Sequence, residues 1–246
     1  MRKIVLVTGS ARGIGASCIL KFASSGYDVV IHYLTSAKEA MALKKEVEEK
    51  YQVRAFCIQA DLKSEFEMKE MLTKIEKEFG SISVLVNNAA FCLDTLYEEK
   101  TKENFMKTLE VNVIGTFLLS RLLGDKMYER KEGTIINITS TNGMDTYFPM
   151  CLDYDASKAA LISLTHNLAL QYAPYIRVNG VAPGWVATEN EIAGLDAAYL
   201  ETESEKIFLR RIGTPEEIAN VVFFLASEEA SYINNTIIRV DGGHYS

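Results

Sequence analysis

A tyrosine and a lysine four residues apart, Tyr154 and Lys158, are the side chains of this sequence best spaced for chemistry. They stand near the start of a helical pattern that runs to about Ala173, and residues four apart on a helix lie on one face, one turn from each other. The Lys158 ammonium can therefore lie close to the Tyr154 oxygen and favour the phenolate. Because a free tyrosine has a pKa of about 10, such a cation lowers the pKa toward the range of a useful acid or base.

The pair alone is a weak signal, because twelve tyrosines and seventeen lysines in 246 residues produce this spacing about once by chance. The alternative is an ordinary helix on which the lysine extends along the tyrosine. Tyr147 is a rival acid, but no lysine follows it one helical turn later. The meaning of the pair depends on the elements that position it.

The whole chain has the composition of a globular protein, with 48% hydrophobic residues and no linker, low-complexity tract or internal repeat. We expect residues 1–246 to form a single domain. The formal charge of -7 and the pI of about 5.2 argue against a general binder of nucleic acid or acidic membranes. The chain enters a strand-like run without a signal peptide and holds no bilayer-spanning stretch, which predicts a cytoplasmic protein.

The four cysteines form no CxxC or metal-ligand spacing and the three histidines are isolated, so we expect reduced thiols and no metal site. Cys151, three residues before Tyr154, is interpreted as a small packing residue at the mouth of a site. A hydrolase that uses Ser140 as its nucleophile fails for want of a partnered histidine. The residues concerned are Cys18, Cys57, Cys92, Cys151, His32, His166 and His244.

A glycine turn follows the first predicted strand, Ile4 to Val7, and a helical pattern then continues to Ser25. Its glycines stand at positions 9, 13 and 15. In a strand, turn and helix of this order we expect Gly9 to allow a tight turn, Gly13 a close backbone approach and Gly15 helix-on-sheet packing. The free N–H groups of the helix N-terminus would then bind a phosphate. A merely structural glycine turn is the alternative.

The second predicted strand, 28–33, ends in Tyr33-Leu34-Thr35-Ser36 without the acidic residue that binds a ribose 2′-OH. Arg12 in the glycine turn and Lys38 close by suit a 2′-phosphate instead. These residues favour NADP over NAD, unless Arg12 only solvates the surface.

Five further strands are predicted at 53–59, 82–86, 134–138, 176–181 and 236–240, and Ser36 with Glu39 and Ser64 with Glu67 form predicted capping boxes. Asp61 follows the third strand, where it accepts a hydrogen bond from adenine or simply makes a turn. Asn87-Asn88 follows the fourth strand and can fix a turn, and Ser140 follows the fifth. Open α/β sheets bind their ligands at this edge.

Two segments between the strands bear on the site. A long helical region is predicted over 101–130, with Asn112, a poor residue for a helix interior, in its middle. Residues 189–209 are polar and irregularly helical, as expected of a lid over a ligand, and we expect this lid to extend over about 185–212. Trp185, the only tryptophan, is either an anchor of this lid or a core residue.

In their order and spacing these segments resemble the short-chain dehydrogenase/reductase family, over essentially the full chain. The resemblance implies a Rossmann-type, doubly wound α/β fold, whose parallel seven-stranded sheet has the order 3-2-1-4-5-6-7 and helices on both faces. It implies an enzyme that transfers hydride between a nicotinamide cofactor and a carbonyl or secondary alcohol. The shared residues are Thr8 to Gly15, Asp61, Asn87-Asn88-Ala89, Asn112, Ser140, Tyr154, Lys158, Pro183-Gly184 and Val240-Asp241-Gly242-Gly243.

The resemblance also assigns roles by matching position. Tyr154 is the proton donor in reduction and Ser140 holds the carbonyl oxygen. Lys158 lowers the pKa of Tyr154 and binds the nicotinamide ribose, while Asn112 carries a water that links Lys158 to solvent. A phenol and a hydroxyl aimed at a developing alkoxide would stabilise its charge. The implied cofactor-binding residues are Gly9, Ser10, Arg12, Gly13, Ile14, Gly15, Tyr33, Thr35, Asp61, Leu62, Asn88, Ala89, Ala90, Tyr154, Lys158, Pro183, Gly184, Val186 and Thr188.

Within the family, residues 211–219 and the Val-Asp-Gly-Gly end look most like the 3-oxoacyl-[acyl-carrier-protein] reductase branch. Reductases of sugars, steroids and small ketones share that end, so these substrates stay open beside acyl thioesters. An acidic carrier protein would favour a basic patch at the site mouth, to which Arg130 and Lys131 could contribute.

The alternative from another class is a non-catalytic dinucleotide-binding sensor or scaffold. The joint presence of Asn112, Ser140, Tyr154 and Lys158 favours the enzyme. The resemblance further implies a homotetramer, with contacts through the Asn112 and Tyr154 helices and the C-terminal strand.

Overall fold

Seven parallel strands form one sheet in the computed structural model, which describes residues 2–243 and, of residues 190 and 191, the backbone alone. The strands lie in the order β3-β2-β1-β4-β5-β6-β7, which confirms the Rossmann-type order expected from the sequence. Every pairing is parallel. The strands are β1 (Ile4–Val7), β2 (Asp28–Tyr33), β3 (Ala55–Gln59), β4 (Val84–Asn87), β5 (Gly133–Ile138), β6 (Ile176–Pro183) and β7 (Ile237–Val240).

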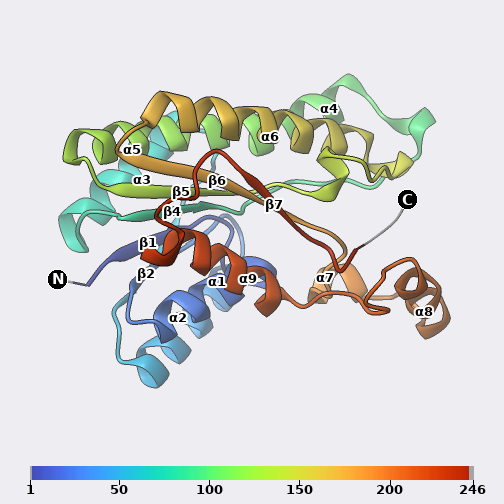
Figure 1. The fold of residues 1–246 in the computed structure, drawn as a ribbon, viewed down its shortest axis with the longest axis horizontal. Coiled ribbons are helices and arrows are strands. Elements are labelled where there is room, and N and C mark those ends of the chain that lie inside the picture. The colour runs from blue at the N-terminus through green and yellow to red at the C-terminus, as the bar shows by residue number, and fades with distance from the viewer. Residues whose placement is uncertain (1, 244–246) are drawn as a thin grey trace.

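Helices cover both faces of the sheet (Figure 1). Figure 1 shows α3, α4, α5 and α6 on one side, α1, α2 and α9 on the other, and α7 and α8 beyond the sheet near its right-hand end. The helices are α1 (Gly13–Ser24), α2 (Ala37–Tyr51), α3 (Glu65–Glu78), α4 (Lys102–Leu109), α5 (Thr116–Arg130), α6 (Leu152–Tyr172), α7 (Glu189–Ile192), α8 (Ala197–Glu205) and α9 (Pro215–Ala226), with a π-helical segment at Glu110–Gly115 and 3₁₀ turns at Tyr97–Glu99, Thr141–Gly143, Pro149–Cys151 and Glu228–Ala230.

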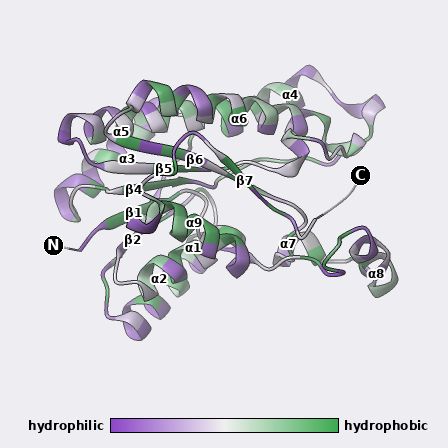
Figure 2. Ribbon diagram, in the orientation of Figure 1, coloured by the Kyte–Doolittle hydropathy of each residue, from purple (hydrophilic) through white to green (hydrophobic). Residues whose placement is uncertain are grey.

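The two helical layers give the protein two hydrophobic cores, and β1 contributes to both. Val5 and Val7 pack with α1, α2 and α9, whereas Leu6 between them packs with α3, α5 and α6. Successive side chains of a strand point to opposite faces, so a strand covered on both faces is apolar throughout. In Figure 2 α9 is largely hydrophobic, and the outer end of α2 is hydrophilic. The continuous apolar run of β1 is thus explained by burial on both faces.

Capping side chains mark the starts of several helices. Thr214 and Glu217 form a full capping box with Pro215 at the first position of α9, and Ser64 accepts a hydrogen bond from the Glu67 N–H at the start of α3. The predicted box at Ser36 is wrong, because the Ser36 side chain makes no capping hydrogen bond although α2 begins at the next residue. Among the described residues, no helix is both long and apolar enough to cross a bilayer.

Candidate active site

The chain order of the sheet reverses between β1 and β4, and the segments that leave these strands are tied together there. Thr8 Oγ1 accepts hydrogen bonds from the N–H groups of Asn88 (2.9 Å) and Ala89 (3.0 Å). In return, Asn88 Nδ2 donates to the carbonyl oxygens of Thr8 (2.9 Å) and Gly9 (3.1 Å). Asn88 therefore fixes the turn, as its position in the sequence predicts, at the place where doubly wound sheets bind nucleotides.

The glycine turn is built on this tie. Gly9 has φ +59°, and a Cβ there would lie 2.9 Å from the Ala89 Cα, so a side chain would push the two segments apart. Gly13 also has φ +59°. A Cβ on Gly15 would meet Asn88 Nδ2 at 2.6 Å and the Ser10 Cα at 2.7 Å, so α1 lies against the segments that leave β4 and β1 with no room for a side chain at this position.

Helix α1 starts from this turn without a side-chain cap. Arg12 is its N-cap residue, has extended backbone and makes no side-chain capping hydrogen bond. Its exposed guanidinium stands beside the turn, and Gly13 and Ile14 open the helix. An uncapped N-terminus leaves backbone donors for an anion.

His32 in β2 ties the glycine turn to the end of β3, a role that sequence reasoning missed. Its Nδ1 accepts the Gly9 N–H at 3.0 Å, so the ring proton is on Nε2, which donates to the Ala60 carbonyl oxygen at 3.1 Å. Its backbone N–H donates to Ser10 Oγ at 3.1 Å, and its carbonyl oxygen accepts the Ser10 N–H at 2.9 Å. Burial lowers the pKa of His32 to about 4, which keeps the ring neutral. The signal in the sequence was a histidine inside an otherwise apolar strand.

The expected adenine-side residues lie at the ends of β2 and β3. Asp61 caps its own turn, since its Oδ1 accepts the Lys63 N–H at 2.9 Å. Leu62 is buried, Tyr33 is half-buried and Thr35 is exposed. The structure therefore gives Asp61 the turn role that the sequence left open, and its Oδ2 pairs with Lys63 Nζ at 3.5 Å.

Ser140 leaves β5 at the same sheet edge and begins a turn that packs on α6. Its Oγ accepts the Asn142 N–H at 3.1 Å. A Cβ on Gly143 would lie 2.6 Å from the carbonyl carbon of Lys158, which shows how closely this turn lies against the helix. Asp155 completes the attachment, because its two oxygens accept from Asn142 Nδ2 (2.7 Å) and from the N–H of residue 148 (3.1 Å).

Asn112 lies in the π-helical segment between α4 and α5. The sequence predicted a helical region over 101–130 with Asn112 in its middle, but it did not predict the π turn. Its Oδ1 accepts the Phe91 N–H at 2.7 Å, and its Nδ2 donates to the Phe91 carbonyl oxygen at 2.9 Å and to Ser157 Oγ at 2.9 Å. Single π turns inside helices are often found at functional sites. Here the turn brings Asn112 to the residue next to Lys158.

Tyr154 and Lys158 lie one turn apart on α6, as predicted. Lys158 Nζ is 5.3 Å from the centroid of the Tyr154 ring and donates to the Ile138 carbonyl oxygen at 2.7 Å. Lys158 is buried, which lowers the pKa of its ammonium to about 8, and the nearby Cys92 opposes part of that effect. The structure thus brings the Lys158 amine, the half-buried Tyr154 and the turn after Ser140 to one place. The rival Tyr147 is 74% exposed.

The segment after β6 lies across this edge. Gly184 has room only for hydrogen, because a Cβ there would clash with the Asp241 Cβ, and Pro183 ends β6. Val186 is buried, and Thr188 lies against Gly13. The Trp185 ring packs edge-on against Tyr199 of α8, with centroids 6.0 Å apart. Trp185 is therefore an anchor for α8, which decides between the two interpretations of this residue.

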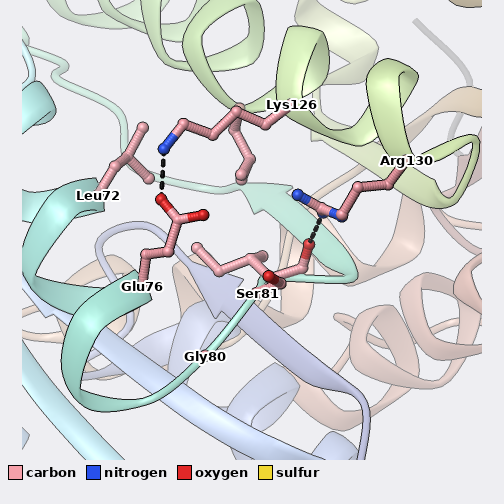
Figure 3. Close-up of a pocket in the computed structure, with 8 residues that line it drawn as sticks. Leu72, Glu76, Gly80, Ser81, Lys126 and Arg130 are labelled. Atoms are coloured by element: carbon pink, nitrogen blue, oxygen red, sulfur yellow. Dashed lines mark hydrogen bonds and ion pairs between the residues drawn. The ribbon is translucent and has the colours of Figure 1, made fainter.

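A small pocket lies at the opposite, amino edge of the sheet, between α3, α5 and the turn before β4 (Figure 3). Arg130 Nη2 donates there to the Ile82 carbonyl oxygen at 2.9 Å. Lys131, next in the chain, lies over the Tyr175 ring just before β6. Both cations are thus at the edge away from Tyr154, so the expectation that they form a basic patch at the site mouth is wrong.

Known proteins resemble this chain over nearly its whole length. The family model described as Enoyl-(Acyl carrier protein) reductase matches residues 9–245. The 3-oxoacyl-[acyl-carrier-protein] reductase FabG of Aquifex aeolicus (strain VF5) is 39% identical over 244 residues, 99% of this chain and 97% of that protein. The structure of ElxO with NADP bound has a TM-score of 0.90 and 30% identity, and covers 98% of each chain. Acetoin dehydrogenase YohF from Salmonella typhimurium has a TM-score of 0.86 and 32% identity, and covers 99% of this chain and 97% of that chain.

Proposed function

Because the chain belongs to the short-chain dehydrogenase/reductase family, we propose that it is an NADP(H)-dependent reductase of 3-oxoacyl thioesters, similar to the 3-oxoacyl-[acyl-carrier-protein] reductases. Family membership makes it a nicotinamide-dependent oxidoreductase. The proposal adds the cofactor preference, the substrate class and the roles of individual residues.

The buried amine of Lys158 carries the proposal. It donates to the Ile138 carbonyl oxygen, and an ammonium has three N–H donors, so two directions are left for the Tyr154 oxygen and for hydroxyls of a ribose. A buried cation is costly unless a partner offsets its desolvation. A phenolate and a bound ligand at this position would provide that partner, which is why we assign the catalytic role to this pair.

The chain's own residues would divide the work of carbonyl reduction. Tyr154 donates its proton to the carbonyl oxygen as that oxygen gains negative charge, and Ser140 donates a hydrogen bond to the same oxygen. Lys158 stabilises the phenolate that Tyr154 leaves behind. Asn112 holds the Phe91 backbone and Ser157 beside Lys158, where a water on its amide would pass protons to solvent. When bound, the nicotinamide supplies the hydride.

The glycine turn fits a dinucleotide. The uncapped start of α1 and the close contact of Gly9 with Ala89 leave backbone donors at the point where the chain order reverses. Arg12 is exposed at this turn, and the end of β2 holds Tyr33 and Thr35 but no carboxylate. We propose that Arg12 and Lys38 favour the 2′-phosphate of NADP(H), and the relative with NADP bound supports this choice.

The segment 185–212 is proposed to close over the bound ligand. It carries α7 and α8, and its two ends are held together because the Ala187 N–H donates to the Gly213 carbonyl oxygen (2.8 Å) and the Gly213 N–H donates to the Trp185 carbonyl oxygen (3.1 Å). The Trp185–Tyr199 contact stiffens the segment between them. A segment attached at its two ends and folded between them is suited to such a movement.

A second substrate class has specific support. The similarity to an acetoin dehydrogenase favours a small hydroxyketone or diketone as the alternative to an acyl thioester. Arg130 and Lys131 lie at the opposite edge of the sheet, so they cannot bind an acidic carrier protein at the site mouth. This also favours a small substrate over a carrier-bound one.

Cofactor oxidation by the purified full chain tests these proposals. We expect NADPH consumption with a 3-oxoacyl thioester to exceed that with diacetyl and acetoin, and NADPH to exceed NADH at least tenfold in kcat/KM. The Tyr154→Phe variant should keep its fold by circular dichroism and lose about 10² to 10⁴ in rate. If diacetyl is reduced and the thioester is not, the substrate class is the small diketones and not the 3-oxoacyl thioesters. An undiminished rate in Tyr154→Phe would overturn the mechanism.

We also propose a homotetramer that forms through α5, α6 and β7. Exposed apolar side chains on two of these elements support this, with Phe117 on α5 and Leu170, 80% exposed, on α6. Sedimentation at assay concentration should give four chains per particle, and a monomer would contradict the proposal.

A further inference from the structure

Two thiols and a carboxylate that no proposed catalytic step uses meet beside the site. Cys92 Sγ and Cys151 Sγ are 3.4 Å apart. Asp94 Oδ1 lies 2.9 Å from the Cys151 sulfur and 3.3 Å from the Cys92 sulfur. All three candidate ligand atoms lie within 4.8 Å of one another. Cys151 is buried, whereas Cys92 and Asp94 are exposed, so the group opens to solvent on one side.

The cluster joins two segments that frame the site. Cys92 and Asp94 follow β4 and the ligand-edge residues 88–90, and Cys151 stands one residue before α6 and three before Tyr154. Cys92 is near enough to influence the pKa of Lys158. The same segments also meet where the Thr95 N–H donates to the Met150 carbonyl oxygen.

We propose that Cys92, Asp94 and Cys151 bind a divalent cation of the Zn²⁺ class at the entrance of the active site. Thiolate sulfur and carboxylate oxygen are ligands of Zn²⁺, and three protein ligands leave a fourth position for water. A bound cation would fix the segment after β4 to the start of α6.

The geometry of the three atoms suits a tetrahedral ion. Zn–S distances of about 2.3 Å and Zn–O distances of about 2.1 Å place two sulfurs about 3.8 Å apart, and a sulfur and an oxygen about 3.6 Å apart. Each edge of the observed triangle is shorter than this by less than about 1 Å, a change within reach of side-chain rotation on an exposed segment.

The charges also balance. Binding deprotonates two thiols, so the site takes up one cation of charge +2 and releases two protons, and it stays at the single negative charge of the Asp94 carboxylate. The Lys100 ammonium lies near the cluster, where it donates to the Leu93 carbonyl oxygen at 2.6 Å, and its charge is paired with the buried Asp153 carboxylate at 2.6 Å.

A disulfide is the competing use of the two thiols. It would need the sulfurs to approach from 3.4 Å to about 2.0 Å, and would remove the contacts of Asp94. The same carboxylate attracts a cation, so the third group favours the metal.

Sequence spacing could not reveal this site, because 59 positions separate its two cysteines. Only the fold brings them together. The sequence-based expectation of no metal site considered ligands that lie close in the chain.

Cobalt titration of the reduced full chain under anaerobic conditions tests the proposal. We expect one Co²⁺ per chain, with a near-ultraviolet thiolate-to-cobalt band, displacement by Zn²⁺ and release of two protons. Cys92→Ser and Cys151→Ser should each lower the band by about half and the affinity at least tenfold. Asp94→Asn should keep the band and lose about tenfold in affinity.

The matched control is Cys57→Ser. Cys57 is a half-buried residue of β3 whose thiol donates to the Ala40 carbonyl oxygen in α2. We expect this variant to bind Co²⁺ as the wild type does. No thiolate band at one equivalent of Co²⁺ would overturn the proposal. So would a band that both serine variants keep, or an air-oxidised protein that loses two thiols while the reduced form ignores Co²⁺.

Discussion

The buried ammonium of Lys158 lies 5.3 Å from the centroid of the Tyr154 ring, and its pKa is lowered to about 8 by that burial. The pair therefore places a costly charge next to a phenol. Proteins commonly hold such unfavourable groups where they are needed for function.

The first prediction concerns Lys158→Met. In the unfolded chain a lysine has a pKa of about 10.4, so at pH 7 burial of the ammonium costs the folded state on the order of 3 kcal/mol. We expect the variant to lose reductase activity and to gain about 2 to 3 kcal/mol in the free energy of unfolding at pH 7. Urea unfolding followed by circular dichroism gives the second quantity.

The pH dependence of this gain has a defined sign. Between about pH 8 and about pH 10.4 the unfolded chain binds the Lys158 proton more tightly than the folded chain, so the wild type becomes more stable as pH rises and the gain shrinks. Lys74→Met, at an exposed site on α3, should show no such change. A gain that is constant with pH would contradict the assignment of the effect to the buried charge.

The second prediction concerns Asp155, which holds the turn after Ser140 through Asn142 and the residue 148 N–H. Asp155→Ala should lower kcat about tenfold without a change in NADPH affinity, because the turn that positions Ser140 loosens. Asp155→Asn keeps one hydrogen-bond acceptor, so its kcat should lie between those of the wild type and Asp155→Ala. Steady-state kinetics and fluorescence titration of NADPH separate the two effects, and equal losses in both would point to a collapsed site.

The same carboxylate predicts an acid limit. Burial is the main cause that raises the pKa of Asp155, so it takes up a proton at a higher pH than an ordinary aspartate. As pH falls through that range its hold on Asn142 weakens, and kcat should fall with it. This limb of the pH profile should be absent in Asp155→Asn.

The third prediction concerns His32, whose neutral ring joins the Gly9 N–H to the Ala60 carbonyl oxygen. His32→Phe leaves both groups unpaired, which should cost about 1 to 3 kcal/mol in stability at pH 7 and about tenfold in NADPH affinity. Thermal unfolding and cofactor titration measure these losses. His166→Phe, at an exposed site on α6, should leave NADPH affinity unchanged.

The difference in stability between the wild type and His32→Phe should become smaller at acid pH. The folded-state pKa of His32 is about 4, below the unfolded value of about 6.5, so from pH 6.5 down to 4 the unfolded chain binds the extra proton and the wild type loses stability. His32→Phe lacks this loss, which amounts to about 3 kcal/mol. Parallel stability curves for the two proteins would rule out a buried neutral His32.

Prediction from sequence succeeded where the local pattern and the final contacts agree. The apolar run of β1 and the spacing of Tyr154 and Lys158 are readable because strand burial and helix periodicity decide them directly. Ser36 illustrates the opposite case, since its capping pattern is present and the hydrogen bond is not. Whether a capping hydrogen bond forms depends on the backbone conformation of the preceding turn, and the sequence pattern does not specify that conformation.

Other features depend on contacts between distant parts of the chain. The π turn at Asn112 forms around the Phe91 backbone and Ser157, and a long helix is the natural interpretation without those partners. His32 was visible as a polar residue in an apolar strand, but its partners Gly9 and Ala60 come from two other strand ends. Such residues become predictable only once the strand order is known.

The last prediction compares two glycines with positive φ. Gly9 (φ +59°) lies against Ala89, whereas a Cβ on Gly26 (φ +85°) would meet nothing within 4 Å. Gly26→Ala should therefore cost only the left-handed strain, about 1 kcal/mol, and leave cofactor affinity unchanged. Gly9→Ala adds a clash with backbone that cannot move without shifting β4, and should cost at least about 2 kcal/mol and tenfold in NADPH affinity. Denaturant unfolding and NADPH titration of both variants decide the matter, because equal effects would mean that the contact between Gly9 and Ala89 does not shape the cofactor turn.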